Sequence, residues 1–236
     1  MLFVFTASSA FGTEVLFVVG GKAIKAGDQT IKKHLENRGF DVVVKNDKLV
    51  KTEDARGKSL VLLSESARSK EVNTKFRDVT VPVICSEPYL FHDLGMTGET
   101  KKFDFGRKSR QKEMAIVNPA HPLAASLSDN VQVSTKSFFM GWGVPGKNAI
   151  PVAALKKDPE KSTIFAYEAG TEMPGNVAPA RRVGLFLFRG TAKSFTPDAW
   201  SLFNAVVDWS IEEPPDSVLK AELKTEEAPV LPPPGR

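Results

Sequence analysis

The chain has 236 residues, of which 42% are hydrophobic and 25% are charged, and its formal net charge is +4. This is the composition of an ordinary globular protein. The single cysteine, Cys85, excludes an intramolecular disulfide, no Cys and His spacing resembles a structural zinc site, and no segment approaches the roughly 18 apolar residues of a membrane span. We therefore expect a folded chain with a sizeable core, no metal and no cofactor.

Residues 1–12 form an apolar stretch that ends in small residues. Ser8 and Ala10 stand where the −3 and −1 positions of a signal-peptidase site would be, although the basic start of a signal peptide is missing. We expect residues 1–12 to be the remnant of a signal peptide, and the protein to be secreted or periplasmic. A plain N-terminal extension of a cytoplasmic protein is the alternative.

The first strand is predicted at Val15–Val19, a continuous apolar run rich in β-branched and aromatic side chains. Such a run is typical of a strand buried on both faces. Gly20 and Gly21 then mark a turn. Asp28 is expected to cap a helix that stops at Gly39.

Apolar runs alternate with polar, helix-like stretches in the next part of the chain. The runs are 42–44, 60–63 and 81–85. Strands that alternate with helices imply right-handed crossovers and a parallel sheet. We therefore expect an α/β protein with a flavodoxin-like, doubly wound, mostly parallel sheet and helices on both faces.

A basic run separates this half from the second. Residues 101–112 contain six basic residues and one acidic residue, and a run of like charges is usually a solvated surface. We expect a solvated loop, which can also bind phosphates. No nucleic-acid partner is expected, because no helix-turn-helix, zinc-finger or RNP signature accompanies the charges.

Short strand-like runs with short connections follow, and they predict an added antiparallel edge or layer. The runs are 114–117, 131–133, 150–154, 163–167 and 183–188. A helix is predicted over 196–211, with Thr196 as its cap and Pro197 in its first turn. Residues 13–211 are thus expected to form the α/β domain. Residues 212–236 are acidic and proline-rich and lack apolar periodicity, so we expect a disordered tail.

Polar residues follow several of the expected strands, where ligands bind in a doubly wound sheet. Gly20 and Gly21 leave backbone N–H groups that suit an anion, and a tight turn is the simpler explanation for them. Ser64 and Glu65 follow the run at 60–63. They are candidate ligand-binding residues, and the alternative is that they cap the next helix.

Glu87, Tyr89 and His92 cluster after the run at 81–85, and His121 opens a turn further along. A carboxylate and a histidine can act as acid and base, so Glu87 and His121 are the candidate catalytic residues. Tyr89 and His92 are candidate ligand-binding residues. The alternative for His121 is a simple turn residue before a proline.

Two further candidates lie in the second half of the chain. Trp142 stands between two glycines, and Glu168 follows a strand-like run. Both could line a sugar site, while an aromatic residue in a glycine-rich loop is also a common packing anchor. Cys85 is expected to be structural, because a reactive thiol needs a helix N-terminus or a cation nearby, and a neighbouring carboxylate raises its pKa.

Six stretches between residues 14 and 211 carry a family resemblance: VLFVVGG, VLLSES, PVICSEPYLFHDLGM, NPAHPLAASL, ARRVGLFLF and VVDWS. In this order they resemble the ThuA-like (trehalose-utilisation) branch of the class I glutamine-amidotransferase-like superfamily. The resemblance implies a flavodoxin-like fold and a link to carbohydrate metabolism. Glutaminase members of the superfamily carry a G-x-C-x-G elbow with a downstream histidine and glutamate. Cys85 lies in VICSEP without either glycine, so glutamine hydrolysis is not expected.

Three functions stay open on the sequence alone. The first is an exported amidotransferase-like domain that binds a small molecule or a carbohydrate. The second is a hydrolase or isomerase that acts on a sugar-like substrate through Glu87 and His121. The third is an interaction module that uses the basic run at 101–112. The oligomeric state is left open.

Overall fold

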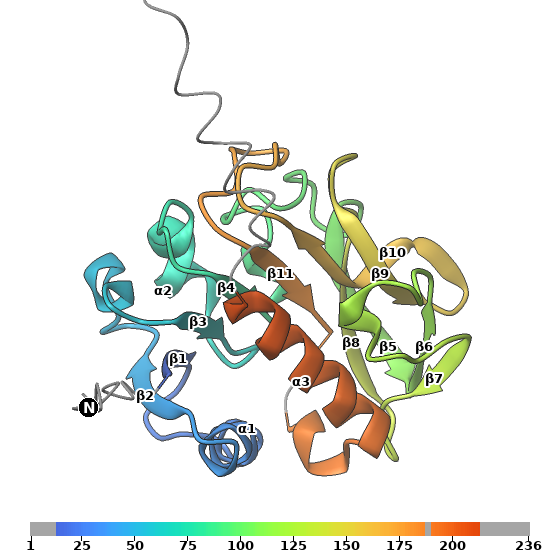
Figure 1. The fold of residues 1–236 in the computed structure, drawn as a ribbon, viewed down its shortest axis with the longest axis horizontal. Helices are drawn as coiled ribbons and strands as arrows, with labels where there is room; N and C mark the ends of the chain where they lie inside the picture. Colours follow the sequence, from blue (N-terminus) through green and yellow to red (C-terminus); the bar gives the residue numbers. More distant parts are fainter. Residues whose placement is uncertain (1–12, 187–189, 213–236) are drawn as a thin grey trace, which may run out of the picture.

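The computed structural model describes residues 13–186 and 190–212. Over these residues the chain forms one mixed sheet of 11 strands with helices packed against it (Figure 1). The expected signal-peptide remnant at 1–12 lies outside the described residues. So do the expected tail from residue 213 onward and residues 187–188 of the last expected strand.

Five parallel strands make up the first half of the sheet. They are β1 (Glu14–Val19), β2 (Asp41–Asn46), β3 (Leu60–Leu63), β4 (Val83–Cys85) and β11 (Arg182–Leu185). Their order is β2-β1-β3-β4-β11, and each neighbouring pair is parallel. The α/β class is therefore confirmed. Because parallel strands end on the same side of a sheet, the residues that follow them lie close together.

Six further strands continue the same sheet in antiparallel pairing. They are β5 (Phe105–Gln111), β6 (Glu113–Ile116), β7 (Asn130–Gln132), β8 (Phe138–Gly143), β9 (Ile150–Leu155) and β10 (Asp158–Tyr167). β10, β9, β6 and β7 follow β11 in that order, and β8 and β5 branch off β10. The expected antiparallel extension is confirmed.

The expectation of a solvated loop over the basic run is wrong for its second half. Residues 105–111 form β5, which pairs with β8, and Phe105 at its start is buried. The strand forms because residues 138–143 supply a hydrogen-bonding partner, and the glycines of that segment hide its strand character in the sequence. Lys108 and Arg110 of β5 remain exposed.

Helices cover both faces of the parallel half. α1 (Ala26–Asn37) and α3 (Pro197–Ile211) lie on one face, where Phe17 of β1 and Phe203 of α3 share a core cluster (Figure 1). α2 (Ser69–Val72) and short 3-10 helices cover the other face, where Leu16 of β1 packs in a second cluster with Phe76. Alternate residues of β1 thus enter two separate cores.

The 3-10 helices of the described residues are η1 (Thr52–Ala55), η2 (Asn73–Phe76), η3 (Pro88–Leu90), η4 (Pro122–Ala124) and η5 (Thr191–Ser194). They are too short to form helix faces and mainly shape the connections between strands. Within the ranges described, no helix combines the length and apolar character that crossing a membrane requires.

The starts of two helices test the predicted caps. Thr196 caps α3, since its hydroxyl accepts a hydrogen bond from the Ala199 N–H at 3.2 Å, and Pro197 is the first helical residue, as predicted. α1 begins differently, because the residue before its first turn is Lys25 and Asp28 lies inside that turn. The expected capping role of Asp28 is wrong, and its carboxylate accepts hydrogen bonds from two serine hydroxyls instead.

A buried arginine fastens β11 to the chain that leads into β4. Arg182 is 0% exposed, and its guanidinium donates to the backbone carbonyl oxygens of Arg77, Val79 and Val81 at 2.6–3.1 Å. Two carbonyl oxygens just before it in the chain also accept hydrogen bonds from it. Burial lowers the pKa of Arg182 to about 10, which leaves it charged at neutral pH.

Candidate functional site

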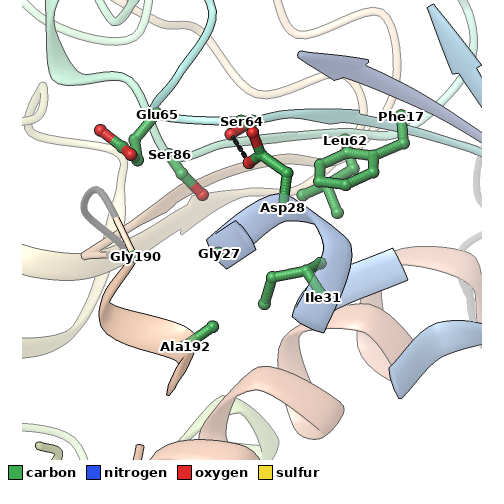
Figure 2. Close-up of a pocket in the computed structure, with 10 residues that line it drawn as sticks. All are labelled: Phe17, Gly27, Asp28, Ile31, Leu62, Ser64, Glu65, Ser86, Gly190 and Ala192. Carbon is green, nitrogen blue, oxygen red and sulfur yellow. Dashed lines mark hydrogen bonds between the residues drawn. The ribbon is translucent and has the colours of Figure 1, made fainter. Parts of the chain in front are cut away.

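A small cavity lies beyond the carboxyl ends of β1, β3 and β4, where the sequence predicts a crevice. Its volume is about 30 Å³. Figure 2 shows the residues around it, which are Phe17, Gly27, Asp28, Ile31, Leu62, Ser64, Glu65, Ser86, Gly190 and Ala192. Apolar side chains from β1, β3 and α1 lie on one side, and the polar side chains of Glu65 and Ser86 lie on the other (Figure 2).

A hydrogen-bond network joins α1 to the ends of β1 and β3. Asp28 accepts from the Ser64 hydroxyl at 2.5 Å and from the Ser66 hydroxyl at 2.7 Å. Ser66 Oγ in turn accepts from the Gly20 N–H at 2.9 Å. The alternative in which the segment after β3 caps the next helix is wrong, because α2 starts after Arg68 with no side-chain cap.

The two glycines after β1 are required for different reasons. Gly21 has a φ of +102°, in the region that favours glycine, which confirms the expected tight turn. At Gly20 the constraint is space, since a Cβ there would lie 1.9 Å from the carbonyl oxygen of Ser66. Because the Gly20 N–H is bonded to Ser66, this amide is already engaged within the chain.

Ser86 and Glu65 bring the other polar groups to the cavity. Ser86 is 0% exposed, and its hydroxyl has no hydrogen-bond partner in the part of the chain that the structure describes. Glu65 is 8% exposed. The predicted candidates Ser64 and Glu65 therefore do line one cavity, together with a serine that the sequence does not single out.

Asp47, at the carboxyl end of β2, forms an ion pair with Arg68. Its carboxylate accepts from the backbone N–H and the guanidinium of Arg68 at 2.6–2.9 Å and is fully buried. Burial raises the pKa of Asp47, but the hydrogen bonds from Arg68 outweigh burial and lower it overall. Asp47 therefore stays ionised and paired beside the crevice.

A second polar cluster lies after β4. Glu87 accepts from the Tyr89 N–H at 3.1 Å and from the Arg107 guanidinium at 2.5 Å. Arg107 also lies over the Tyr89 ring, 4.8 Å from its centre. Tyr89 and His92 both pack against Phe105, with ring centres 5.8 Å and 4.9 Å away. The structure thus brings Glu87, Tyr89 and His92 together.

His121 lies at the opposite, amino end of the parallel strands. β11, β10, β9 and β6 reverse direction at each step, so the segment after β6 emerges where β11 begins. There the His121 ring contacts Trp209 with 5.6 Å between ring centres, and Glu168 pairs with Arg181 at 2.7 Å. The structure does not bring Glu87 and His121 together, because their strands belong to oppositely directed parts of the sheet.

The position of His121 predicts a pH dependence of stability. Burial lowers the pKa of His121 below its ordinary value of 6.5, an effect that Glu168 opposes and Arg181 reinforces. The unfolded chain then binds a proton more readily than the folded chain, so stability is full above pH 6.5 and falls as the pH drops through that value.

His121→Asn tests this dependence. Asparagine can still accept a hydrogen bond from the Leu123 N–H, as His121 does, but it does not titrate. We expect the urea midpoint of the variant to change less than that of the wild type between about pH 7 and about pH 5. Equal pH dependence in the two proteins would contradict the assignment.

Trp142 is a core residue of β8, so the expectation that it lies in a glycine-rich loop is wrong. Its side chain is 5% exposed, and a Cβ at Gly106 would come within 2.8 Å of its ring. The Lys161 ammonium lies 4.9 Å from the ring. Trp142 therefore has the environment of a packing anchor, the alternative to a sugar-binding role.

Cys85 is buried within β4, as expected of a structural cysteine. Its Sγ contacts the Glu87 carbonyl oxygen at 3.4 Å. Burial raises the pKa of the thiol well above its ordinary value, and the nearby carboxylates of Glu87 and Asp93 raise it further. A cysteine nucleophile needs the opposite conditions.

The sequence does not single out Ser86 or Arg107. The available signal for Ser86 is its place directly after β4. Arg107 reaches Glu87 only because β5 pairs with β8, a contact that no local pattern reveals. Among the described residues, no group of three or more His, Cys, Asp or Glu side chains could hold a metal ion.

No protein-family model matches this chain, and no curated protein matches it. Solved structures do match its fold. One, a GMP synthase component from Thermoplasma acidophilum, is 12% identical with a TM-score of 0.53 and covers 90% of this chain and 98% of its own. Another, a ThuA-like protein of Bacteroides uniformis, is 11% identical with a TM-score of 0.53 and covers 90% of this chain and 97% of its own. The chain thus shares its overall fold with these two proteins.

Proposed function

We propose that this protein is an amidotransferase-like domain without glutaminase activity that binds a carbohydrate beyond the carboxyl ends of β1, β3 and β4. The strand order β2-β1-β3-β4-β11 supports a flavodoxin-like, doubly wound parallel half, with β11 as its fifth strand. In that arrangement the order reverses between β1 and β3, and ligands bind at such a point. The small cavity lies there.

The observation that carries the proposal is the hydroxyl of Ser86. It lines the cavity, is fully buried and has no hydrogen-bond partner among the described residues. A buried polar group without a partner costs about 1–3 kcal/mol. A ligand hydroxyl that bonds to Ser86 would recover this free energy. Ser64, by contrast, is already bonded to Asp28.

The volume of the cavity limits what can enter it. About 30 Å³ is close to the share of one water molecule in the liquid and far below the roughly 300–1,000 Å³ of a complete ligand pocket. The cavity therefore admits a single hydroxyl group, and the rest of the ligand lies outside it. A carbohydrate presents many such groups, and the ThuA-like sequence resemblance supports a carbohydrate over other alcohols.

The environment of Cys85 supports the absence of glutaminase activity. Its thiol is buried, its pKa is raised and it lies within a strand rather than on a turn. We therefore expect incubation with glutamine to release no ammonia. Ammonia release that is lost in Cys85→Ser would overturn this part of the proposal.

Ser86→Ala tests the binding site. We expect the variant to bind carbohydrate about tenfold more weakly, because a tenfold change corresponds to one hydrogen bond of about 1.4 kcal/mol. We also expect its unfolding free energy to rise by up to about 1–3 kcal/mol, because the free protein loses no hydrogen bond and the variant removes a buried polar group that has no partner among the described residues. Titration calorimetry against mono- and disaccharides, trehalose included, measures the first effect, and urea unfolding measures the second.

Two matched serine variants control this experiment. Ser128→Ala removes an exposed hydroxyl and should change neither quantity. Ser64→Ala removes a hydroxyl that bonds Asp28 and should lower the unfolding free energy by about 1–3 kcal/mol. The proposal fails if no carbohydrate of the panel binds, or if Ser86→Ala binds it as well as the wild type does.

A further inference from the structure

β5 and β8 form a two-stranded ribbon whose far end is open to solvent on both faces. Lys108, Ser109 and Arg110 are consecutive residues of β5 and are all exposed. Neighbouring residues of a strand point to opposite faces, so neither face is covered at this position. We call residues 106–112 and 136–140 the basic ribbon.

One edge of β5 has no strand beside it. Within the described part of the chain, β5 pairs with β8 alone. An isolated bridge from Lys101 reaches Phe105, the first residue of β5. Residues 108–111 form no backbone–backbone hydrogen bond to a described residue outside the β5–β8 ladder, and one carbonyl oxygen among them, that of Ser109, accepts from the Gln111 side chain at 2.7 Å. This edge therefore offers a row of N–H and C=O groups to which another strand can add.

The surroundings of this edge are strongly cationic. A hollow of about 650 Å³ is lined by Lys108, Arg110, Gln111, Lys112, Glu113, Ser137, Leu155, Lys156, Lys157 and Asp158. Glu113 pairs with Lys156 at 2.7 Å, and Asp158 pairs with Lys161, so both carboxylates are neutralised. The remaining cations form no ion pair with a described residue: Lys108, Arg110, Lys112 and Lys157.

A second hollow, lined by two phenylalanines as well as by polar residues, adjoins the cationic one. Its volume is about 420 Å³, and its walls include Phe138 and Phe139 of β8. It shares Arg110 and Ser137 with the larger hollow. Phe139 is 50% exposed, so its ring can contact a bound side chain. Side chains of a bound strand would thus meet cations and an aromatic surface next to each other.

A second copy of the same edge is a poor partner for the basic ribbon. Exposed lysines on an edge strand repel another such strand, and a bulge bends the edge away. β5 has both features, because its register shifts between Lys108 and Gln111, and Arg110 has a φ of +58°. The exposed charges disfavour pairing with a like-charged strand, whereas an acidic strand would neutralise them. The bulge interrupts the ladder whatever the charge of the incoming strand, so a bound strand pairs on either side of it.

We propose that the basic ribbon binds an extended acidic peptide segment, which adds as a strand to the free edge of β5 and places one apolar side chain against the exposed Phe139. The free backbone edge favours a peptide over a polysaccharide or a nucleic acid, because only a peptide supplies alternating N–H and C=O groups at the spacing of a strand. The four cations of the larger hollow that form no ion pair with a described residue favour a peptide that carries negative charge. This binding is separate from the proposed carbohydrate site.

Fluorescence anisotropy of a labelled peptide tests the proposal. The probe alternates Glu and Val and carries one Phe, and the full-length protein is titrated into it. We expect saturable binding that weakens as salt is raised, because the contacts are exposed charges. The double variant Lys108→Glu/Arg110→Glu should weaken binding more than tenfold. The matched variant Lys33→Glu/Lys48→Glu makes the same change of charge away from the ribbon and should not.

A backbone-modified probe separates strand addition from simple charge attraction. The same peptide with alternate backbone nitrogens methylated keeps its charges but cannot complete a strand ladder, so its binding should be lost. Equal binding of the methylated peptide would overturn the proposal. A failure of the unmodified peptide to bind would also overturn it, and binding of heparin or single-stranded RNA in that case would show that the ribbon attracts polyanions by charge alone.

Discussion

Arg182→Leu is expected to lower the free energy of unfolding by about 3–5 kcal/mol, the cost typical of breaking a buried charged network. The leucine fills much of the space but donates no hydrogen bond. The carbonyl oxygens of Arg77, Val79 and Val81 would then lose the guanidinium that they face in the interior. Urea denaturation followed by circular dichroism measures the effect.

Arg38→Leu is the matched control for this variant. Arg38 pairs with Asp208 across α1 and α3, and the Asp208 side chain is 57% exposed. An exposed ion pair contributes about 0–1 kcal/mol, so the control should lose little stability. If Arg182→Leu cost no more than Arg38→Leu, the carbonyl oxygens would have other donors and Arg182 would not fasten β11 to β4.

Gly20→Ala is expected to cost about 2–4 kcal/mol, at or above the upper end of the overpacking range, and to impair the carbohydrate site at the same time. The added Cβ would lie 1.9 Å from the carbonyl oxygen of Ser66, and backbone cannot swing away as a flexible side chain can. The end of β1 and the turn after β3 must then separate. That movement breaks the hydrogen bond from Gly20 to Ser66 and disturbs Asp28.

Gly39→Ala separates the effect of space from the effect of conformation. Gly39 has a φ of +92°, but a Cβ there would meet nothing within 4 Å. Only the conformational penalty of about 1–2 kcal/mol applies. We expect Gly39→Ala to leave carbohydrate affinity unchanged, while Gly20→Ala reduces both affinity and stability. Equal stability losses in the two variants would show that the close contact at Gly20 relaxes easily.

The parallel half of the fold is predictable from the sequence because its strands are buried on both faces. Such strands must be apolar throughout, and the runs at β1, β3 and β4 stand out for that reason. β5 and β8 are harder to predict. β5 is charged because most of its side chains face solvent, and its Gly106 leaves space for the ring of Trp142. In β8, Gly143 leaves space for Phe91 and Phe165. Each of these two strands forms because it pairs with the other, so neither carries a hydrophobic pattern that predicts it on its own.

The candidate site was predictable only in its parallel part. Gly20, Ser64 and Glu65 follow parallel strands, so their convergence follows from chain order alone. His121 follows β6, and its position depends on the number of reversals between β6 and β11. That number is fixed by the pairing of β9 and β10, which the runs of apolar residues do not reveal.

The pairing of β4 with β11 has a consequence for the order in which the chain folds. Val83 pairs with Arg182, so one side of β4 has no neighbour until nearly all of the described chain has left the ribosome. Contacts between residues so distant in sequence slow folding, and an unpaired strand edge promotes aggregation in the meantime. The strands β1 to β4 are synthesised first, but their part of the sheet stays incomplete until β11 pairs with β4.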